Sequence, residues 1–429
     1  MTRTLVSFDI ASIKQFVFAT DRLREIRGAS GLLDRLNRVD LPKVAERVDH
    51  QARLIFSGGG TGLVLVSSQA AQNVCAELER TFAEATVHGR LNTAHIEVPQ
   101  QGGDYGALYS TLAARLRIAK QIPPDFVCSP THPLMMPCGL CGDHYATTWS
   151  KDPDGQELPT CGACEAKLNY DRMLRRQLGE GKWPGFWEDL DSAARSKGGG
   201  LAGCKRPEDL AQIVEDSGEE LALIYADGDG LGRLLAEART LEDLQKRSQA
   251  VEQSLFAALA QALGGPLRPR DGRLPFDVFL IGGDDLVLAT RASKAFSTAE
   301  LLASQFHAHS GELLGWPASL SIGIAMAHAR YPFRHLLELG EGALKQAKRE
   351  RFLAQRDGNF PKDGPGWISY VRVSGSSFHS FEDYESNELL AIEDGKPVRR
   401  SLRPFTPSFL RTIQSAAREL APVARTKLE

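Results

Sequence analysis

Apolar and polar positions alternate most clearly in the second half of the chain, where they predict the order of strands and helices. Residues 221–226 and 276–281 are apolar runs of strand length, and residues 286–289 form a third run after a short turn. Between the first two runs, residues 241–263 carry leucine, valine and alanine at helical spacing. This part of the sequence therefore predicts a strand, a long helix and then a β-hairpin.

The same kind of pattern continues downstream. Residues 318–328 are apolar and predict a strand, and residues 333–351 have the spacing of an amphipathic helix. A last strand is expected at residues 371–373, followed by an irregular segment over 374–405 and a helix over 407–420. The order βαββαβα is that of a ferredoxin-like α+β sheet, which forms the palm of nucleotide polymerases and cyclases.

The first half of the chain has the same order of elements around a different turn. Gly58, Gly59 and Gly60 lie between two apolar runs, so glycines occupy the turn of a predicted hairpin. The elements predicted here are strands over residues 4–10, 52–56 and 62–66, a helix that opens at residues 13–18, and a helix over residues 32–36. The recurrence predicts an internal duplication, and hence two ferredoxin-like palm domains.

Composition and charge predict a soluble protein of the cytoplasm. The 429 residues include 51 Lys and Arg against 54 Asp and Glu, which gives a net charge of −3. A chain this close to neutral is not built as an indiscriminate nucleic-acid binder. No apolar run has the length that spans a membrane, and no signal peptide is expected, so we expect no membrane partner.

The strongest chemical signal is the pair of carboxylates in the predicted hairpin turn Gly282-Gly283-Asp284-Asp285. The glycines allow a sharp turn and let a phosphate approach the backbone closely. The aspartates present hard oxygen ligands of the kind that Mg²⁺ or Mn²⁺ binds. Nucleotidyl transfer needs this combination, although the turn by itself is equally compatible with an ordinary solvated hairpin.

A second group of carboxylates follows the apolar run at residues 221–226. Asp227, Gly228 and Asp229 lie at its end, next to the predicted hairpin turn of the same sheet. Carboxylates from two neighbouring strands would converge on one metal site. Lys348, in the predicted amphipathic helix, could reach a triphosphate, with a solvated helical lysine as the alternative.

Four cysteines between the two halves form two C-x-x-C pairs. Cys138 and Cys141 make the first pair, and Cys161 and Cys164 make the second about twenty residues later. Each pair aims two thiolates at one ion, and four thiolates make a closed, structural Zn²⁺ site. Disulfides and a thioredoxin-like redox pair are less favoured, because neither a signal peptide nor a βαβ unit accompanies the cysteines.

Breaks in the pattern predict the domain boundaries. Pro123-Pro124 ends the first predicted palm, and Gly198-Gly199-Gly200 lies in the segment between the palms. The predicted domains are a first, Gly-rich, non-catalytic palm over residues 1–125, a zinc-binding and helical linker over 126–215, a second, catalytic palm over 216–373, and an irregular segment with a C-terminal helix over 374–429.

Several stretches together resemble a known family. Residues 224–231, the turn at 282–285, and residues 321–328 with Tyr331-Pro332 resemble the second palm domain of the large polymerase-like subunit of type III CRISPR effector complexes. The helix ending at residues 343–348 is also similar to a helix of GGDEF diguanylate cyclases, a related palm. In the CRISPR family this palm makes cyclic oligoadenylates from ATP.

The resemblance implies roles for individual residues. The carboxylates that match metal ligands are Asp227, Asp284 and Asp285, with Asp229. The positions that match nucleotide contacts are Gly228, Gly282, Gly283 and Lys348. The first half resembles the first, non-catalytic palm of the same subunit, in which a Gly-rich turn lines a second nucleotide site. This implies that the glycines at 58–60 bind a nucleotide.

The chain also departs from the family pattern. The CRISPR subunit usually begins with a histidine–aspartate nuclease domain, and no His-Asp dipeptide occurs in this sequence. DNA cleavage is therefore not expected. The family's C-terminal helical domain is at most a remnant here. The expected small-molecule partner is ATP or another NTP. A subunit of an effector complex would also bind guide and target RNA and other CRISPR subunits, whereas a stand-alone enzyme would bind neither.

The leading hypothesis is an enzyme in which Asp227, Asp284 and Asp285 hold Mg²⁺ or Mn²⁺ and NTPs are joined into a cyclic oligonucleotide for antiviral defence. A nucleotide in the first palm would supply the attacking hydroxyl. One alternative is a silent scaffold for RNA or protein, which the repulsion between clustered acids disfavours. Another is a diguanylate-type cyclase, although those enzymes pair identical palms.

Overall fold

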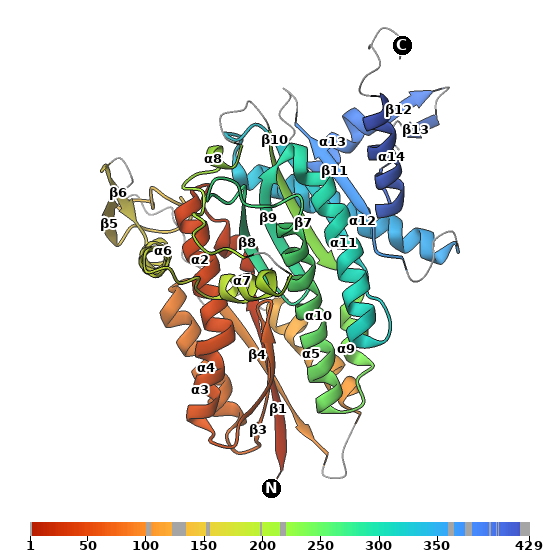
Figure 1. Ribbon diagram of the computed structural model, residues 1–429. Helices are drawn as coiled ribbons and strands as arrows, with labels where there is room; N and C mark the ends of the chain where they lie inside the picture. Colours follow the sequence, from red (N-terminus) through yellow and green to blue (C-terminus); the bar gives the residue numbers. More distant parts are fainter. Residues whose placement is uncertain are drawn as a thin grey trace. The chain divides into compact units, whose positions relative to one another are not determined.

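The structure is a computed structural model, and it describes residues 2–99, 104–121, 134–151, 155–197, 200–214, 220–358, 364–373, 380–393, 396–399, 401 and 403–420. Contacts divide the chain, coloured by sequence in Figure 1, into two compact units. The first unit comprises Met1–Asp189 and Gly230–Glu252, and the second comprises Leu190–Asp229 and Gln253–Glu429. The domain boundaries predicted at 125, 215 and 373 fall within or beside segments that lie outside the described residues.

The second unit contains a five-stranded sheet in the order β11-β10-β7-β9-β8 (Figure 1). Its strands are β7 (Leu221–Gly228), β8 (Phe276–Gly282), β9 (Asp285–Arg291), β10 (Leu320–Ala327) and β11 (Ile368–Arg372). β7 pairs antiparallel with β10 on one side and with β9 on the other, and β11 joins β10 in parallel. β8 and β9 form the predicted hairpin, and the strands predicted for this half are confirmed, except that the last one begins at Ile368 and ends at Arg372, where 371–373 was predicted.

Helices connect these strands in the order of a ferredoxin-like fold. α10 (Leu241–Leu263) follows β7, α11 (Ala292–Leu314) follows β9, and α12 (Phe333–Arg356) follows β10. Two shorter helices come before β7, namely α7 (Phe186–Ser196) and α8 (Ala211–Val214). With β7 to β10 counted as first to fourth, the order across the sheet is fourth, first, third, second. The predicted α+β class is confirmed.

Gly323 in β10 determines how closely α12 approaches the sheet. A Cβ at this position would lie 2.2 Å from Gly340 O and 2.4 Å from Leu344 N, both in α12. A side chain would therefore push the helix away from the sheet. Tyr225 is the register partner of Gly323 in β7, so the two share this face. The close approach lets later turns of α12 reach the end of β7.

The first unit contains a four-stranded sheet in the order β2-β3-β1-β4. Its strands are β1 (Arg3–Ala11), β2 (Arg53–Gly58), β3 (Thr61–Ser67) and β4 (Arg90–Val98). β1 pairs antiparallel with β3 and β4, and β2 and β3 form a hairpin around the glycine turn. Counted along the chain, the order is again fourth, first, third, second. The strand order of the second unit thus recurs here.

One helix of the first unit differs from its prediction. The helices are α1 (Ile13–Val17), α2 (Leu23–Arg35), α3 (Leu41–Val48), α4 (Ala71–Thr86), α5 (Tyr105–Gln121), α6 (Gly162–Gly179) and α9 (Leu231–Ala236), with a π-helical turn (Leu36–Asp40) between α2 and α3. The sequence predicts only residues 32–36 as helix in this region, which is wrong. Gly28 and Gly31 have low helix propensity and hide the earlier turns of α2.

Those glycines serve the packing of α2 against α6, the helix that carries the second cysteine pair. A Cβ at Gly28 would lie 1.9 Å from Lys167 O, and one at Gly31 would lie 2.8 Å from Leu174 Cδ1. The two helices can approach this closely only because both positions lack a side chain. A two-stranded sheet of β5 (Thr148–Lys151) and β6 (Glu157–Thr160) precedes α6.

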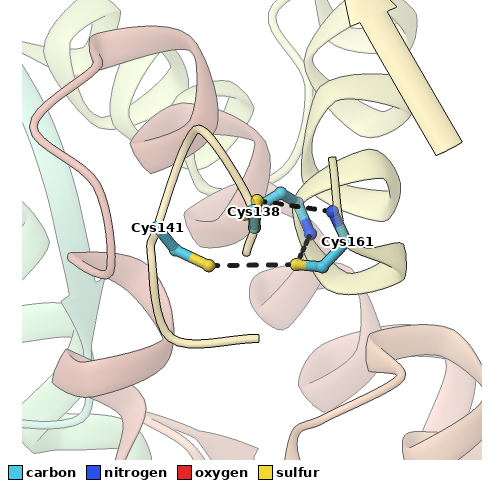
Figure 2. A group of neighbouring side chains, drawn as sticks. Cys138, Cys141 and Cys161 are labelled. Atoms are coloured by element: carbon cyan, nitrogen blue, oxygen red, sulfur yellow. Dashed lines mark hydrogen bonds between the residues drawn. The ribbon is translucent and has the colours of Figure 1, made fainter. Parts of the chain in front are cut away.

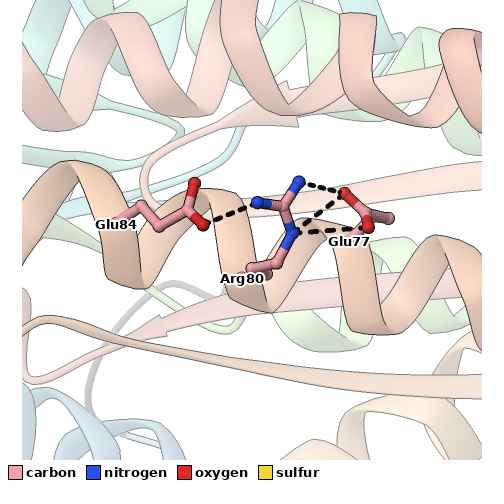
Figure 3. Close-up of polar contacts among 3 residues, drawn as sticks. All are labelled: Glu77, Arg80 and Glu84. Carbon is pink, nitrogen blue, oxygen red and sulfur yellow. Dashed lines mark hydrogen bonds and ion pairs between the residues drawn. The ribbon is translucent and has the colours of Figure 1, made fainter.

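The outer face of α4 shows how this unit meets solvent. Arg80 lies between Glu77 and Glu84 on successive turns and donates hydrogen bonds to both carboxylates (Figure 3). Arg80 and Glu84 are exposed and Glu77 is partly exposed. Such pairs add little to stability, so α4 is held by its opposite, apolar face, which includes the buried Leu78 and Phe82.

The C-terminal segment is more regular than predicted. Residues 374–405 are expected to be irregular, but 380–399 contain α13 (Phe381–Tyr384), a π-helical turn (Glu385–Leu389), and a hairpin of β12 (Leu390–Glu393) and β13 (Lys396–Arg399). Charged residues and Pro397 interrupt the alternation and hide such short strands. The terminal helix α14 (Pro407–Leu420) has the predicted bounds. No helix in the described ranges is long and apolar enough to cross a membrane.

Candidate functional site

Carboxylates from two neighbouring strands of the second unit meet at one end of the sheet. Asp227 lies near the end of β7, opposite Ser321 of β10. On the other side of β7, Ala226 is opposite Leu286 of β9, so the next step of the same register aligns Asp227 with Asp285. Aligned residues of adjacent strands project from the same face. This register, continued by one residue, brings Asp227 and Asp285 to neighbouring positions.

Asp284 lies beside them in the turn of the β8–β9 hairpin. Gly282 is opposite Asp285, so Gly283 and Asp284 are the two central residues of a tight turn. Gly283 has a φ of 58°, in the left-handed region that favours glycine, and two-residue hairpin turns need such a residue. The predicted Gly-Gly-Asp-Asp turn is confirmed as a turn, with one carboxylate at its tip and one at the start of β9.

The electrostatics of this turn are those of crowded like charges. Burial and, next, the negative charge of Asp285 raise the pKa of Asp284 to about 7. Burial also raises the pKa of Tyr225, to which the charge of Asp285 adds. A divalent cation would relieve the repulsion between these adjacent carboxylates, because it stabilises the charged form of each. The residues at this end of the sheet therefore fit Mg²⁺ or Mn²⁺ by their donor chemistry.

Lys348 reaches the same place from α12. Its ammonium forms an ion pair with Asp227 and donates a hydrogen bond to Gly228 O at 3.0 Å. The side chain is 35% exposed, so it is neither fully buried nor free in solvent. The sequence left open whether Lys348 reaches a triphosphate or is a solvated helical lysine. Its contacts place it at the carboxylate site, which favours the first of these.

Asp229 has a different environment from the other carboxylates. Its Oδ2 accepts a hydrogen bond from Ser321 Oγ at 3.0 Å and lies 3.3 Å from Arg351 Nε. Its amide donates to Ser319 O at 2.9 Å. The side chain is 4% exposed, and burial raises its pKa against the opposing charge of Arg351. These contacts hold the Asp229 carboxylate against β10 and α12.

Arg351 and Ser321 are site residues that the sequence reasoning missed. Arg351 follows Lys348 by three positions, which places the two cations on neighbouring turns of one helix face. That spacing was a readable signal. Ser321 looks like one polar residue in an apolar strand, and only the sheet register shows that it is opposite Asp227.

The glycine turn of the first unit contains no carboxylate of its own. Gly59 and Gly60 have φ values of 60° and 83°, so both adopt the left-handed conformation. Glu252 lies next to Gly58, where a Cβ would be 3.1 Å from its Oε1. Burial raises the pKa of Glu252, and the nearby Arg38 opposes the shift. The sequence predicts no acid beside this turn, because Glu252 is far away in sequence. It lies in the part of α10 that belongs to the first unit.

The four cysteines of the first unit come together as the sequence predicts. One sulfur atom from each of Cys138, Cys141, Cys161 and Cys164 lies within 4.8 Å of all the others. Figure 2 shows the first three, with the amide of Cys161 donating to Cys138 Sγ at 3.3 Å. Cys164 N donates to Cys161 Sγ at 3.5 Å at the start of α6. Four convergent sulfurs supported by amide donors fit Zn²⁺.

Comparison with known proteins agrees with this description of the second unit. Residues 220–357 match the family model of Cas10/Cmr2, second palm domain. This part of the chain is a Cas10-type palm. The match includes all of β7, the Gly-Gly-Asp-Asp turn and all of α12, so it spans the whole carboxylate site. The family expected from the sequence is confirmed for this domain.

Solved structures share the fold at low sequence identity. The Csm1–Csm4 cassette in complex with cA4 is 16% identical with a TM-score of 0.53, over 81% of this chain and 53% of that chain. The Csm1–Csm4 subcomplex of the type III-A CRISPR-Csm interference complex is 17% identical with a TM-score of 0.52, over 81% of this chain and 53% of that chain. Csm1 of T. onnurineus is 14% identical with a TM-score of 0.53, over 90% of this chain and 56% of that chain. This chain thus spans just over half the length of these proteins. No curated protein matches its sequence.

Proposed function

We propose that the Cas10-type palm is a metal-dependent nucleotidyltransferase that joins ATP into a cyclic oligonucleotide. The observation that carries this proposal is the pairing of Ala226 with Leu286, because this register, continued by one step, brings Asp227 of β7 opposite Asp285 of β9, beside Asp284 in the turn. A structural sheet end has no need of three neighbouring carboxylates, because their mutual repulsion costs stability. A site that binds divalent cations and a triphosphate does need them.

The proposed roles follow from the position of each side chain. Asp227, Asp284 and Asp285 would hold the cations, and bound Mg²⁺ or Mn²⁺ would lower the pKa of the attacking hydroxyl and neutralise the pyrophosphate that leaves. Gly282 and Gly283 leave room for phosphate oxygens near the backbone. Lys348 exchanges its contact with Asp227 for one with the triphosphate. Because its side chain is flexible and partly exposed, this exchange needs no backbone movement.

Asp229 has a positioning role in this account. Its carboxylate already has Arg351 and Ser321 as partners. The residue therefore fixes the turn that follows β7, and through it the direction of the Asp227 side chain. It serves the metal site indirectly, in the way that outer-shell partners orient metal ligands.

Nucleotide complexes of the similar structures support ATP as the substrate. The Csm1–Csm4 cassette has been solved with cA4, with pppApA and with AMPPNP. These ligands belong to those proteins. Because this chain shares their fold and matches the Cas10/Cmr2 palm across its carboxylate site, adenosine nucleotides are the first substrates to test. A cyclic oligoadenylate made in this way would act in CRISPR-type antiviral defence.

The remaining parts of the chain have supporting roles in the proposal. The recurring strand order makes the first unit a second, non-catalytic palm, with the turn at Gly58, Gly59 and Gly60 as a nucleotide site. The four cysteines hold a structural Zn²⁺ ion. The similar structures contain Csm1 with Csm4, so we propose a subunit of that kind, with CRISPR RNA, as a partner in the cytoplasm.

Incubation of the purified chain with Mg²⁺ or Mn²⁺ and each NTP, followed by mass spectrometry of the products, tests this function. We expect cyclic oligoadenylates from the wild type and none from Asp284→Ala/Asp285→Ala, because the variant lacks two of the three proposed metal ligands. The variant should still fold, because the turn carboxylates contribute little to the core. Asp357→Ala, an exposed aspartate at the end of α12, is the matched control and should keep full activity. Undiminished synthesis by the double variant would disprove the metal site. If added RNA and partner subunits also elicit no product from the wild type, the chain is a scaffold.

A further inference from the structure

The glycine turn of the first unit rests on the helix that follows β1. A Cβ at Gly60 would lie 2.1 Å from Ile13 Cδ1, so the side chain of Ile13 fills the space directly under the turn. Gly60 O accepts a hydrogen bond from Ile10 N at 2.8 Å. The end of β1 and the first residue of α1 therefore set the position of the turn.

The other end of α1 is held by a buried lysine from α6. Lys167 Nζ donates a hydrogen bond to Phe16 O at 2.6 Å and lies 4.2 Å from the centroid of the Phe16 ring. The last carbonyls of a helix lack partners within the helix, and in a helix of five residues they are a large share of the whole. The ammonium supplies one such partner. Lys167 is 2% exposed, so water does not compete for this bond.

Lys167 also lies beside the cysteine cluster. It comes three residues after Cys164 on α6, so the two residues lie on neighbouring turns of one face of that helix. Phe16 packs against the same cluster. Four thiolates around one Zn²⁺ ion carry net negative charge, which a neighbouring buried cation partly offsets. Lys167 is therefore a neighbour of the zinc centre along α6 and a direct contact of α1, whose Phe16 packs against that centre.

We infer that Lys167 couples the zinc centre to the glycine turn of the first unit. The loaded cysteine cluster keeps Lys167 and Phe16 in place, Lys167 fixes the end of α1, and Ile13 at the start of α1 supports Gly60. The zinc centre thus orders the turn as well as its own segment. The coupling itself is a property of this unit, and only its consequence for nucleotide binding at the turn rests on the proposed function.

Amide hydrogen exchange of the zinc-loaded protein tests the first link. Lys167→Met keeps the aliphatic stem and removes the ammonium, and Lys182→Met, at an exposed lysine beyond the same helix, is the control. We expect about tenfold faster exchange in peptides covering residues 10–18 and 57–63 of Lys167→Met, as for loss of a hydrogen bond to a charged group. Zinc content should stay at the wild-type level, and Lys182→Met should exchange like the wild type. Wild-type exchange in both peptides of zinc-loaded Lys167→Met would overturn the inference.

Ile13→Ala tests the second link, the support of the glycine turn by α1. It is also the variant to use if Lys167→Met unfolds, and faster exchange in a peptide covering residues 90–98 in β4 would report such unfolding. This variant is expected to speed exchange at 57–63 and to leave zinc content and exchange at 161–167 unchanged. Protection of 57–63 equal to that of the wild type would show that α1 does not support the turn. Since no nucleotide is used, failure of the chain to bind ATP would sink the proposed function and leave the coupling intact.

Discussion

Asp229 and Asp284 belong to the same end of the second unit, but their carboxylates have different surroundings. Asp284 is crowded by the like charge of Asp285, whereas Asp229 is compensated by Arg351 and a serine hydroxyl. The sequence presents both as acids next to glycine and predicts both as metal ligands. Residue types and turn positions were readable from the chain. The partners of each carboxylate depend on sheet register and helix placement, which no local pattern contains.

The raised pKa of Asp284 predicts a pH-dependent affinity for the divalent cation. A carboxyl group with a pKa of about 7 is mostly protonated below that pH, and the cation must displace its proton. The apparent affinity should therefore fall about tenfold for each pH unit below 7 and level off above it. Titration with Mn²⁺, followed by electron paramagnetic resonance from pH ~5.5 to ~8.5, measures this. Constant affinity over that range would contradict the assignment of Asp284 as a ligand.

The contacts of Asp229 predict the effect of removing its cation. Arg351→Met leaves the buried carboxylate without its ion pair and should weaken apparent Mg²⁺ affinity in the ATP reaction about 10-fold, as loss of outer-shell partners does. Arg351→Lys should restore part of that affinity. Arg349→Met, at an exposed arginine of the same helix, serves as the control. A lower kcat with unchanged metal dependence would argue against a positioning role.

Among the elements, α10 and α14 have the bounds expected from periodicity, while the first turns of α2 and the β12–β13 hairpin were missed. Long segments with an uninterrupted apolar stripe are readable because burial of one face dominates their stability. α2 escapes because Gly28 and Gly31 serve its contact with α6, so tertiary packing overrides local propensity.

The close contact of α12 with β10 predicts a large effect of adding one methyl group. Gly323→Ala would place a Cβ 2.2 Å from Gly340 O and should lower the free energy of unfolding by about 1–3 kcal/mol, the usual range for overpacking. Gly264→Ala, whose Cβ would have only an ordinary contact at 3.5 Å, is the control. Denaturant unfolding measures both. Equal stability of the two variants would mean that α12 does not approach the sheet this closely.

At the scale of the whole molecule, the two sheets share one strand order, and only one of them carries carboxylates at its hairpin turn. The sequence supports that contrast, because Gly58-Gly59-Gly60 and Gly282-Gly283-Asp284-Asp285 occupy equivalent turns between predicted strands. What it could not supply is the pairing of β7 with both β9 and β10. That pairing joins segments far apart in the chain and creates the site.

We propose that Asp227, Asp284 and Asp285 form one divalent-cation site for a nucleoside triphosphate. Titration of the chain with Mn²⁺ in the presence of AMPPNP, followed by electron paramagnetic resonance, tests it most directly. We expect nucleotide-dependent Mn²⁺ binding by the wild type, lost in Asp227→Asn and in Asp285→Asn alike, with wild-type unfolding midpoints for both variants. Binding that survives either substitution would contradict it.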